Sequence, residues 1–187
     1  MEAFSMWEKN DIQKVLFTNE EIVNRSRELG EQITNEYGKE GKKPLVVALL
    51  KGSVPFLAEL IKHIDLDIMM DFMDVSSYEG KESTGNIRIL KDLDTDVKNV
   101  DVLLVEDIID TGRTLATVIE MLKSRGASSV KIVSLLNKPC NRVNGCNPDY
   151  YGFEVGNEFV VGYGMDFDQK YRCLSYIGVL KEECYKK

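Results

Sequence analysis

Histidine and paired cysteines are almost absent from this chain of 187 residues. Its single histidine is His63, and its four cysteines are Cys140, Cys146, Cys173 and Cys184. The cysteines form no CxxC pair and have no histidine near them in the sequence, so neither a zinc site nor a thiol-redox motif is indicated. We expect four free thiols, as in a protein of the reducing cytosol.

Long apolar runs and clusters of basic residues are also missing. No segment approaches the ~20 apolar residues that a membrane-spanning helix needs, and the amino-terminal segment lacks the pattern of a signal peptide. The chain carries 24 basic and 31 acidic residues, a net charge of −7, without a run of lysines or arginines. We therefore expect a cytoplasmic protein whose partners include neither a membrane nor a nucleic acid.

The residues that are present suit one compact domain over 1–187. Hydrophobic residues make up 43% of the chain and there are only 4 prolines. This length and composition support one substantial core and leave little room for two full domains. No internal repeat or low-complexity linker divides the sequence.

Amphipathic helices are predicted at three places. The first, over residues 18–37, opens with Thr18 and Glu21 at the spacing of a capping box. The second, over 53–64, has Pro55 in its first turn, and the third begins at residue 115 and ends before a glycine. Apolar residues at helical spacing mark the first and third helices: Ile22, Leu29, Ile33, Tyr37, Leu115, Val118, Ile119 and Leu122.

Five strands alternate with these helices. Residues 45–50 are continuously apolar, as in a strand covered on both faces. Residues 100–105 predict another buried strand, and residues 130–136 the next one. Residues 67–75 and 86–90 alternate in polarity and enclose a polar segment, which predicts a hairpin with a long mobile loop. Apolar strands alternating with helices predict an α/β fold, a parallel twisted sheet flanked by helices, because parallel neighbours need crossover connections.

The last fifty residues have a different character. They are aromatic, rich in glycine and strand-like, with no clear helix. We expect a core over about residues 38–137 and a small flap from the amino-terminal segment and about 138–187. A flap at the carboxyl ends of the strands would cover the edge where parallel sheets bind ligands.

The segment VEDIIDTGRTL places acids beside a turn that suits an anion. The amides at a helix start, a glycine and the hydroxyls of Thr111 and Thr114 fit a phosphate. Glu106 and Asp107, at the carboxyl edge of a buried strand, would repel that phosphate unless they faced a sugar diol or a divalent cation. A ribose 5-phosphate unit with Mg²⁺ nearby meets both demands.

Other interpretations of this segment exist. Most acids at helix starts only cap the helix, but the continuation DTGRT favours a phosphate site. A phosphate-switch receiver would need separated acids at several strand ends, and a dinucleotide-binding domain would need a GxGxxG motif, which the chain lacks.

The same segment resembles the phosphoribosyl-diphosphate signature of the type I phosphoribosyltransferases: apolar residues, two acids, two apolar residues, Asp, Thr or Ser, Gly, any residue, Thr. The similarity covers nearly the whole chain and narrows to the hypoxanthine-guanine branch of that family. LKGS is similar to its first loop, SSYEGKESTG to its second, and KPCNRV and EFVVGYGMDFDQKYR to its base-binding segments. The resemblance implies the α/β core of that family with a hood above it.

The resemblance also implies where phosphoribosyl diphosphate binds. The 5-phosphate would lie against Asp110, Thr111, Gly112, Arg113 and Thr114. The ribose hydroxyls and magnesium would lie at Glu106 and Asp107. Pyrophosphate would contact Lys51 and Gly52, in a loop with a cis peptide bond between Leu50 and Lys51, and also Arg172 from the EFVVGYGMDFDQKYR segment. Ser77 and Tyr78 would belong to a lid that protects the activated sugar from water.

The purine site is implied by four further positions. Lys138 would donate to the 6-oxygen of the base, which separates 6-oxopurines from adenine. Phe159 would stack on the base, and the backbone of Val160 and Asp166 would contact its edge. The Asp166 side chain also matches a position linked to magnesium.

The implied reaction is attack by purine N9 on the anomeric carbon of phosphoribosyl diphosphate, with Asp110 as general base or acceptor at purine N7. Two rival functions stay open: a regulatory protein that binds the phosphoribosyl ligand without catalysis, and an enzyme for adenine or another base. Members of the family form dimers or tetramers, so we expect a homodimer or homotetramer.

Overall fold

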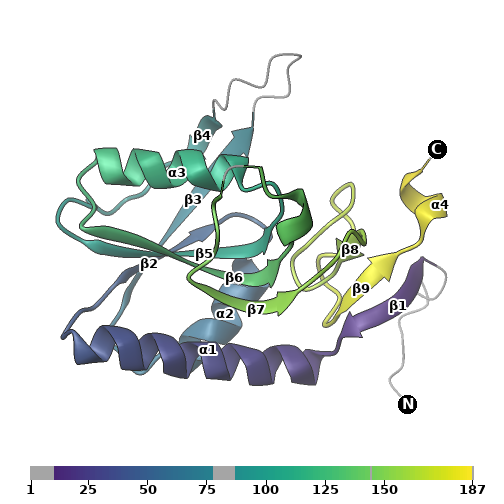
Figure 1. The fold of residues 1–187 in the computed structure, drawn as a ribbon, viewed down its shortest axis with the longest axis horizontal. Helices are drawn as coiled ribbons and strands as arrows, with labels where there is room; N and C mark the ends of the chain where they lie inside the picture. Colours follow the sequence, from purple (N-terminus) through teal and green to yellow (C-terminus); the bar gives the residue numbers. More distant parts are fainter. Residues whose placement is uncertain (1–10, 78–86, 144, 187) are drawn as a thin grey trace.

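The protein folds into two sheets, described here from a computed structural model over residues 11–77, 87–143 and 145–186. Figure 1 shows the smaller sheet beside the larger one. The larger has the spatial order β4 (Ile87–Lys91), β3 (Met69–Ser77), β2 (Leu45–Leu49), β5 (Asp101–Ile109), β6 (Ser129–Asn137) and β7 (Tyr150–Glu154). The smaller, which we call the hood, has the order β1 (Ile12–Phe17), β9 (Ile177–Leu180) and β8 (Val160–Val161).

The expected α/β class is confirmed. β2 pairs in parallel with β3 and β5, and β6 pairs in parallel with β5 and β7. The exception is β4, which runs antiparallel to β3 at the edge of the sheet. The connection from Ser77 to Ile87 is too short for the crossover that a parallel neighbour requires, and a hairpin needs none.

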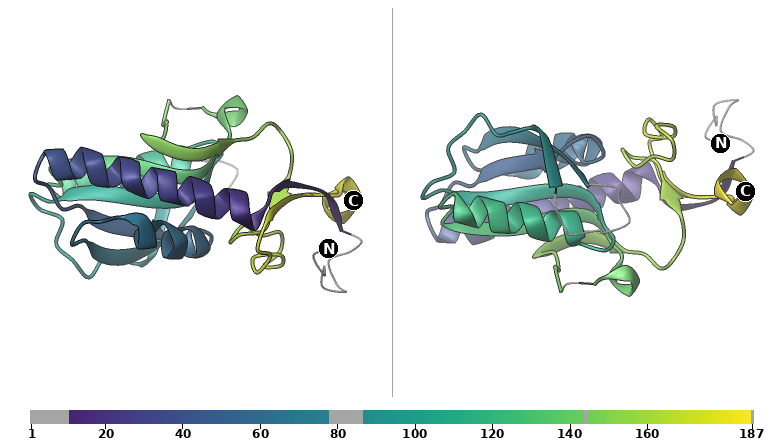
Figure 2. Two further views of the ribbon diagram at one scale, coloured as in Figure 1. Left: turned by 90° about the horizontal axis from the view of Figure 1, so that it is seen from below. Right: turned by 90° about the horizontal axis from the view of Figure 1, so that it is seen from above.

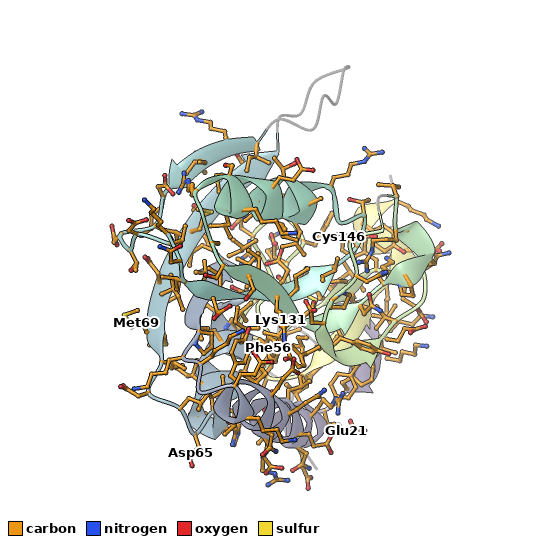
Figure 3. All side chains as sticks on the ribbon, turned by 60° about the vertical axis from the view of Figure 1, so that its left-hand side comes forward. Glu21, Phe56, Asp65, Met69, Lys131 and Cys146 are labelled. Atoms are coloured by element: carbon orange, nitrogen blue, oxygen red, sulfur yellow. The ribbon has the colours of Figure 1, made fainter. Side chains whose placement is uncertain are left out.

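Helices cover both faces of the larger sheet. Figure 2 shows α1 (Asn19–Lys39) on one face and α3 (Arg113–Ser124) on the other, and α2 (Val54–Leu60) packs beside α1. Successive side chains of β2 alternate between the two cores, Val46 facing the α1 side and Val47 the α3 side. The largest fully buried side chain belongs to Phe56 of α2, which Figure 3 places inside the molecule.

The helix predictions are confirmed with small changes in length. The capping box is formed: the Thr18 hydroxyl accepts from the Glu21 amide, and the Glu21 carboxylate accepts from the Thr18 amide. The second helix ends earlier than expected and continues as a 3₁₀ turn over Ile61–His63. The apolar positions that marked the first and third helices are buried except Ile119, which is half-buried.

The last fifty residues required corrections. β7 joins the larger sheet, so the hood begins later than residue 138; this edge strand is half-exposed and lacks the apolar run of its neighbours. Short helices also occur, a 3₁₀ turn over Pro139–Asn141 and α4 (Glu182–Tyr185), where none was expected. The amino-terminal segment contributes β1 to the hood, as expected of a flap that uses both ends of the chain.

None of the four cysteines forms a disulfide bond, as the sequence predicted, and Cys140 and Cys173 are exposed. In the part of the chain that the structure describes, no helix has both the length and the apolar character of a membrane span.

Asp71 links β3 to the segment that leads into β5. Its side chain is only 5% exposed and accepts from three backbone amides, those of Phe72 at 2.7 Å and of Asp94 and Thr95 at 2.9 Å. Burial alone would raise the pKa of this carboxyl, but hydrogen bonds from the Phe72 amide, from the amide and side chain of Thr95 and from the Asp94 amide outweigh it and hold the pKa below its usual value. The ionised form is therefore the one that stabilises the fold.

We expect Asp71→Asn to lower the free energy of unfolding by about 2 kcal/mol at neutral pH, because a neutral amide is a weaker acceptor for these amides. A carboxyl whose folded pKa is lowered stabilises fully above its unfolded pKa of about 3.9, and the contribution is lost as the pH falls through the folded pKa. Urea denaturation should therefore show the difference from the wild type at neutral pH and a smaller one at about pH 3.

Asp94→Asn is the matched control. The Asp94 side chain is 87% exposed and pairs only at the surface, with Lys91 at 3.1 Å. The Asp94→Asn substitution should lower the free energy of unfolding by less than about 0.5 kcal/mol. Equal costs for the two variants would contradict the assigned role of Asp71.

Candidate active site

Two adjoining pockets lie at the carboxyl ends of β5 and β6, where the sequence predicted a ligand site. One has a volume of about 210 Å³ and the other of about 170 Å³. Ile108 and Asp110 line both. The larger, which we call the base pocket, is also lined by Asp107, Lys138, Glu158, Phe159, Val160, Met165 and Asp166. The smaller, the turn pocket, is also lined by Glu106, Ile109, Thr111, Gly112, Arg113, Thr114 and Leu115.

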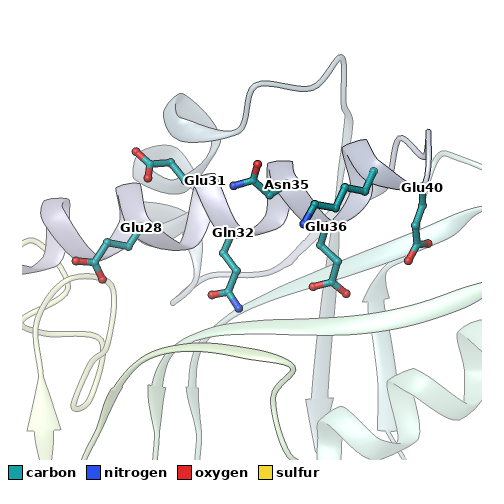
Figure 4. Close-up of a pocket in the computed structure, with 7 residues that line it drawn as sticks. Glu28, Glu31, Gln32, Asn35, Glu36 and Glu40 are labelled. Carbon is teal, nitrogen blue, oxygen red and sulfur yellow. The ribbon is translucent and has the colours of Figure 1, made fainter.

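A third, larger depression is not part of this site. It runs along the outer side of α1, as Figure 4 shows, and is lined by residues of that helix and its carboxyl end. Four of the lining side chains are glutamates and one is a lysine, and none belongs to the predicted site.

The turn pocket has the geometry expected of a phosphate site. Gly112 adopts a φ of 75°, in the left-handed region that favours glycine, and α3 begins directly after it. Gly112 is the N-cap of α3 and has no side chain, so no carboxylate at that position competes for the first amides of the helix. Thr111 and Arg113 are exposed, and the Thr111 hydroxyl accepts weakly from the Arg113 amide at 3.4 Å.

The pairing of β5 with β6 brings Asp110 and Lys138 to the same place. The last paired residues are Ile109 and Asn137, and the two site residues follow them directly. The Lys138 amide continues the ladder by donating to the Ile109 carbonyl at 3.0 Å. The Lys138 side chain is 8% exposed, and its ammonium donates to the Glu158 carbonyl at 3.1 Å.

Asp110 has a carboxylate oxygen that the fold does not use. Its Oδ1 is buried and has no hydrogen-bond partner among the described residues. An unsatisfied buried acceptor costs free energy, and such groups in native proteins commonly serve a ligand or a reaction. Since Asp110 lines both pockets, this oxygen can accept from a ligand that fills either one.

Glu106 and Asp107 lie in surroundings that disfavour their charge. Burial, with the negative charge of Asp107 added, raises the pKa of Glu106 well above its usual range. Burial also raises the pKa of Asp107 to about 6, although the Ile108 amide at 2.7 Å and the charge of Arg172 act against it. Both carboxyls would be stabilised by hydroxyl donors or by a cation from a ligand.

Two glycines allow close contacts between the first loop (residues 50–53), Asp107 and the hood. A Cβ on Gly52 would lie 1.6 Å from Asp107 Oδ2, and a Cβ on Gly164 would lie 1.9 Å from the Gly52 carbonyl oxygen. Neither position can hold a side chain without moving its neighbour. The peptide bond between Leu50 and Lys51 in this loop is cis, as the resemblance implied.

Arg172 is bonded to Gly164, the hood glycine that lies against Gly52. It donates to the Gly164 carbonyl at 2.7 Å and pairs with Asp166 at 2.8 Å. Its Nε is buried and has no partner in the described part of the chain, which leaves one donor for an anion.

Phe159 is supported by aromatic rings from the hood's carboxyl-terminal side. It stacks on Tyr185 of α4 with ring centroids 4.7 Å apart, and Phe167 meets it edge-on at 5.5 Å. Neither of these rings lines the base pocket, whereas Phe159 does. The next residue, Val160, is buried and begins β8.

The structure brings most of the predicted residues together. Asp107, Lys138, Phe159, Val160 and Asp166 share the base pocket. Glu106 and the whole turn from Asp110 to Thr114 share the other. Lys51 is exposed and lines neither pocket.

The two residues expected in the lid lie at the edge of the described part of the chain or beyond it. Ser77 is described only as the last residue of β3, where it pairs with Ile87, and Tyr78 lies outside the described residues. The sequence did not point to Glu158 or Met165 as pocket residues, and only their neighbours in the base-binding segment suggested that region.

The acids of the site fit magnesium only in part. Carboxylate oxygens are the hard ligands that Mg²⁺ prefers, and Asp107 and Asp166 face the same pocket. Among the described residues, no group of three acidic, histidine or cysteine side chains is arranged to hold a metal ion. Mg²⁺ is commonly bound by one or two carboxylates together with substrate phosphates, so these residues suit an ion that arrives with a diphosphate.

Comparisons with known proteins agree with this geometry. Residues 13–168 match the family of phosphoribosyl transferase domains. Over 96% of its length the chain is 57% identical to the hypoxanthine-guanine phosphoribosyltransferase of Streptococcus thermophilus, 99% of which is covered. A relative of the same name from Lactococcus lactis is also 57% identical, over 97% of this chain and 100% of the relative.

A solved structure is similar to this protein over nearly the whole chain. The crystal structure of a hypoxanthine phosphoribosyltransferase from Staphylococcus aureus is similar with a TM-score of 0.94 and 47% identity, and the match covers 99% of this chain and 100% of that one.

We expect Gly52→Ala to disrupt the close contact between the first loop and Asp107. The added methyl group would displace the Asp107 carboxylate, so the affinity for phosphoribosyl diphosphate with Mg²⁺ should fall about 10-fold or more, measured by calorimetry. Gly38→Ala is the control, because a Cβ there meets only Leu66, at 3.8 Å. Wild-type affinity in the Gly52 variant would refute this account.

Proposed function

The chain belongs to the family of phosphoribosyl transferase domains, and we propose that it transfers the 5-phosphoribosyl group from phosphoribosyl diphosphate to hypoxanthine or guanine. The products are IMP or GMP and diphosphate, as in purine salvage. The observation that carries the proposal is the position of Asp110, whose unpartnered buried Oδ1 belongs to a residue that lines both pockets. A purine in one and a phosphoribosyl unit in the other would meet beside it.

Asp110 would act on the base. A carboxylate oxygen with no protein partner can accept the proton or hydrogen bond of purine N7 while N9 attacks the anomeric carbon. The bond to the sugar forms at N9, and the bond between the anomeric carbon and the diphosphate oxygen breaks. Positive charge that develops on the purine is thereby stabilised where it arises.

Lys138 would select the base. Its ammonium donates to the Glu158 carbonyl, and both residues line the base pocket with Asp110. A 6-oxygen can accept from this ammonium, whereas the 6-amino group of adenine would place a donor against a donor. Phe159 provides an aromatic face for the ring, supported from behind by Tyr185.

The sugar and its phosphates would use the other residues. The 5-phosphate would accept from the amides and hydroxyls of the turn from Thr111 to Thr114, and the ribose hydroxyls would donate to Glu106 and Asp107. Arg172, and Lys51 from the first loop, would contact the departing diphosphate.

Magnesium is the proposed cofactor. Asp107 and Asp166, with Glu106 nearby, would hold it, and when bound it neutralises charge on the diphosphate. We further propose a cytoplasmic homodimer or homotetramer, on the family resemblance alone.

We expect diphosphate release when the protein is incubated with magnesium phosphoribosyl diphosphate and either hypoxanthine or guanine, and little release with adenine. Separate incubations with hypoxanthine, guanine, xanthine and adenine, followed by a coupled diphosphate assay, measure this. No release with any base would refute catalysis and favour a binding protein. Release with adenine alone would refute the role given to Lys138.

We expect Asp110→Asn to lower kcat by about 10²- to 10⁴-fold, the usual contribution of a general base. The dissociation constant of phosphoribosyl diphosphate should change by less than about threefold, since the amide keeps the shape of the turn. Single-turnover kinetics and calorimetry measure the two quantities. Equal losses in both would indicate that Asp110 shapes the turn and takes no part in proton transfer; Asp94→Asn, at the exposed acid, serves as control.

A further inference from the structure

The segment after β6 runs alongside the signature turn. At its start the Lys138 amide donates to the Ile109 carbonyl at 3.0 Å, and at its end the Val143 amide donates to the Thr111 carbonyl at 3.3 Å. Between these two bonds lies Arg142, a half-buried residue that sequence analysis left without a role.

The guanidinium of Arg142 joins three parts of the chain. Its Nε donates to the Asp110 carbonyl at 3.1 Å, and one terminal nitrogen donates to the Ile109 carbonyl at 3.0 Å and to Asn137 Oδ1 at 2.6 Å. The other terminal nitrogen donates to the Cys146 carbonyl. The end of β5, the end of β6 and the loop towards β7 are therefore held by one side chain.

All four acceptors are neutral, and among the described residues Arg142 has no salt bridge. Hydrogen bonds from a charged donor are stronger than neutral ones, and the rigid fork of a guanidinium fixes the relative directions of its acceptors. A lysine ammonium has one nitrogen and could not reach these separated carbonyls together.

These contacts hold the main chain beside the Asp110 carboxylate and the Lys138 ammonium without bonding to either of those groups. Arg142 contacts the main-chain carbonyl of Asp110, and it leaves Oδ1 of that residue without a partner. It also holds Asn137, the residue before Lys138. Arg142 lines neither pocket, so it would act through these neighbours.

We propose that Arg142 is a positioning residue that holds the turn pocket and the base pocket at a fixed separation, so that a purine nucleotide occupies both at once. This inference rests on the proposed function, because it assigns the purine to one pocket and the phosphoribosyl group to the other. Loss of the bridge would misplace Lys138 against Asp110 and weaken a ligand that spans both pockets. A ligand confined to the turn would be affected far less.

The test compares GMP, which spans both pockets, with ribose 5-phosphate, which fills only the turn. Calorimetry on the full chain would measure both dissociation constants for the wild type, Arg142→Gln and Arg142→Lys. We expect GMP affinity to fall about 10-fold or more in both variants, and ribose 5-phosphate affinity to change by less than about threefold. The lysine variant keeps the charge, so a loss there identifies the fork geometry as the cause.

Arg25→Gln is the matched control. Arg25 also joins two elements through backbone carbonyls, those of Gly152 at 3.0 Å and Tyr151 at 2.9 Å, but it lines neither pocket. Its variant should keep the wild-type ratio of the two affinities. Thermal unfolding of each variant confirms that it is folded, and Arg142→Lys carries the test if the glutamine variant is not.

Equal losses for GMP and ribose 5-phosphate in the Arg142 variants would overturn the proposal, and so would a changed ratio in Arg25→Gln. Failure of the proposed reaction looks different. A wild type that binds GMP more tightly than ribose 5-phosphate but releases no diphosphate would refute the reaction, and the ratio in the variants would still decide the role of Arg142.

Discussion

The parallel ladder between β5 and β6 is the constraint on which the rest of the site depends. β2 stops pairing with β5 at Ala48 and Val105, whereas β6 continues to the pair of Ile109 and Asn137. The last part of β5 therefore has a neighbour on one side only, and on the open side the first loop approaches Asp107 at Gly52. Because parallel strands leave a sheet at the same edge, the acid after one strand and the lysine after the other must emerge together.

The electrostatics of the site are incomplete without a ligand. Glu106 and Asp107 are half-buried and have raised pKa values, yet they stand beside a turn suited to a phosphate. Among the described residues, the cation that lowers the pKa of Asp107 is Arg172, which also pairs with Asp166. A ligand with hydroxyl groups, phosphates and a metal ion would satisfy donors and acceptors that the protein leaves apart, so binding and charge compensation are one event.

Periodicity predicted the elements with a strong apolar pattern and missed those without one. α1 and α3 each bury one face, and β2, β5 and β6 are covered on both sides, so their patterns were clear. β7 is a half-exposed edge strand whose composition matches the hood that follows, so its sequence could not separate it from the hood. The signature motif predicted the residues of the turn pocket, and the base-binding segments of the resemblance predicted residues of the base pocket. The sequence did not predict the contacts of Arg142, because its partners are mainly backbone carbonyls. Every residue carries such a carbonyl, so no sequence pattern identifies the partners.

The hood draws together segments from opposite ends of the chain. In the described part of the chain β9 is the only sheet neighbour of β1, and β8, which carries Val160, pairs only with β9. A chain that emerges from the ribosome can complete the ladder of β5 and β6, and with it the phosphate turn, while β1 still has nothing to pair with. β8, which carries Val160 of the base pocket, pairs with β9, and β9 follows both pockets in the sequence. The residues of the turn pocket are therefore synthesised before the strand that completes the hood.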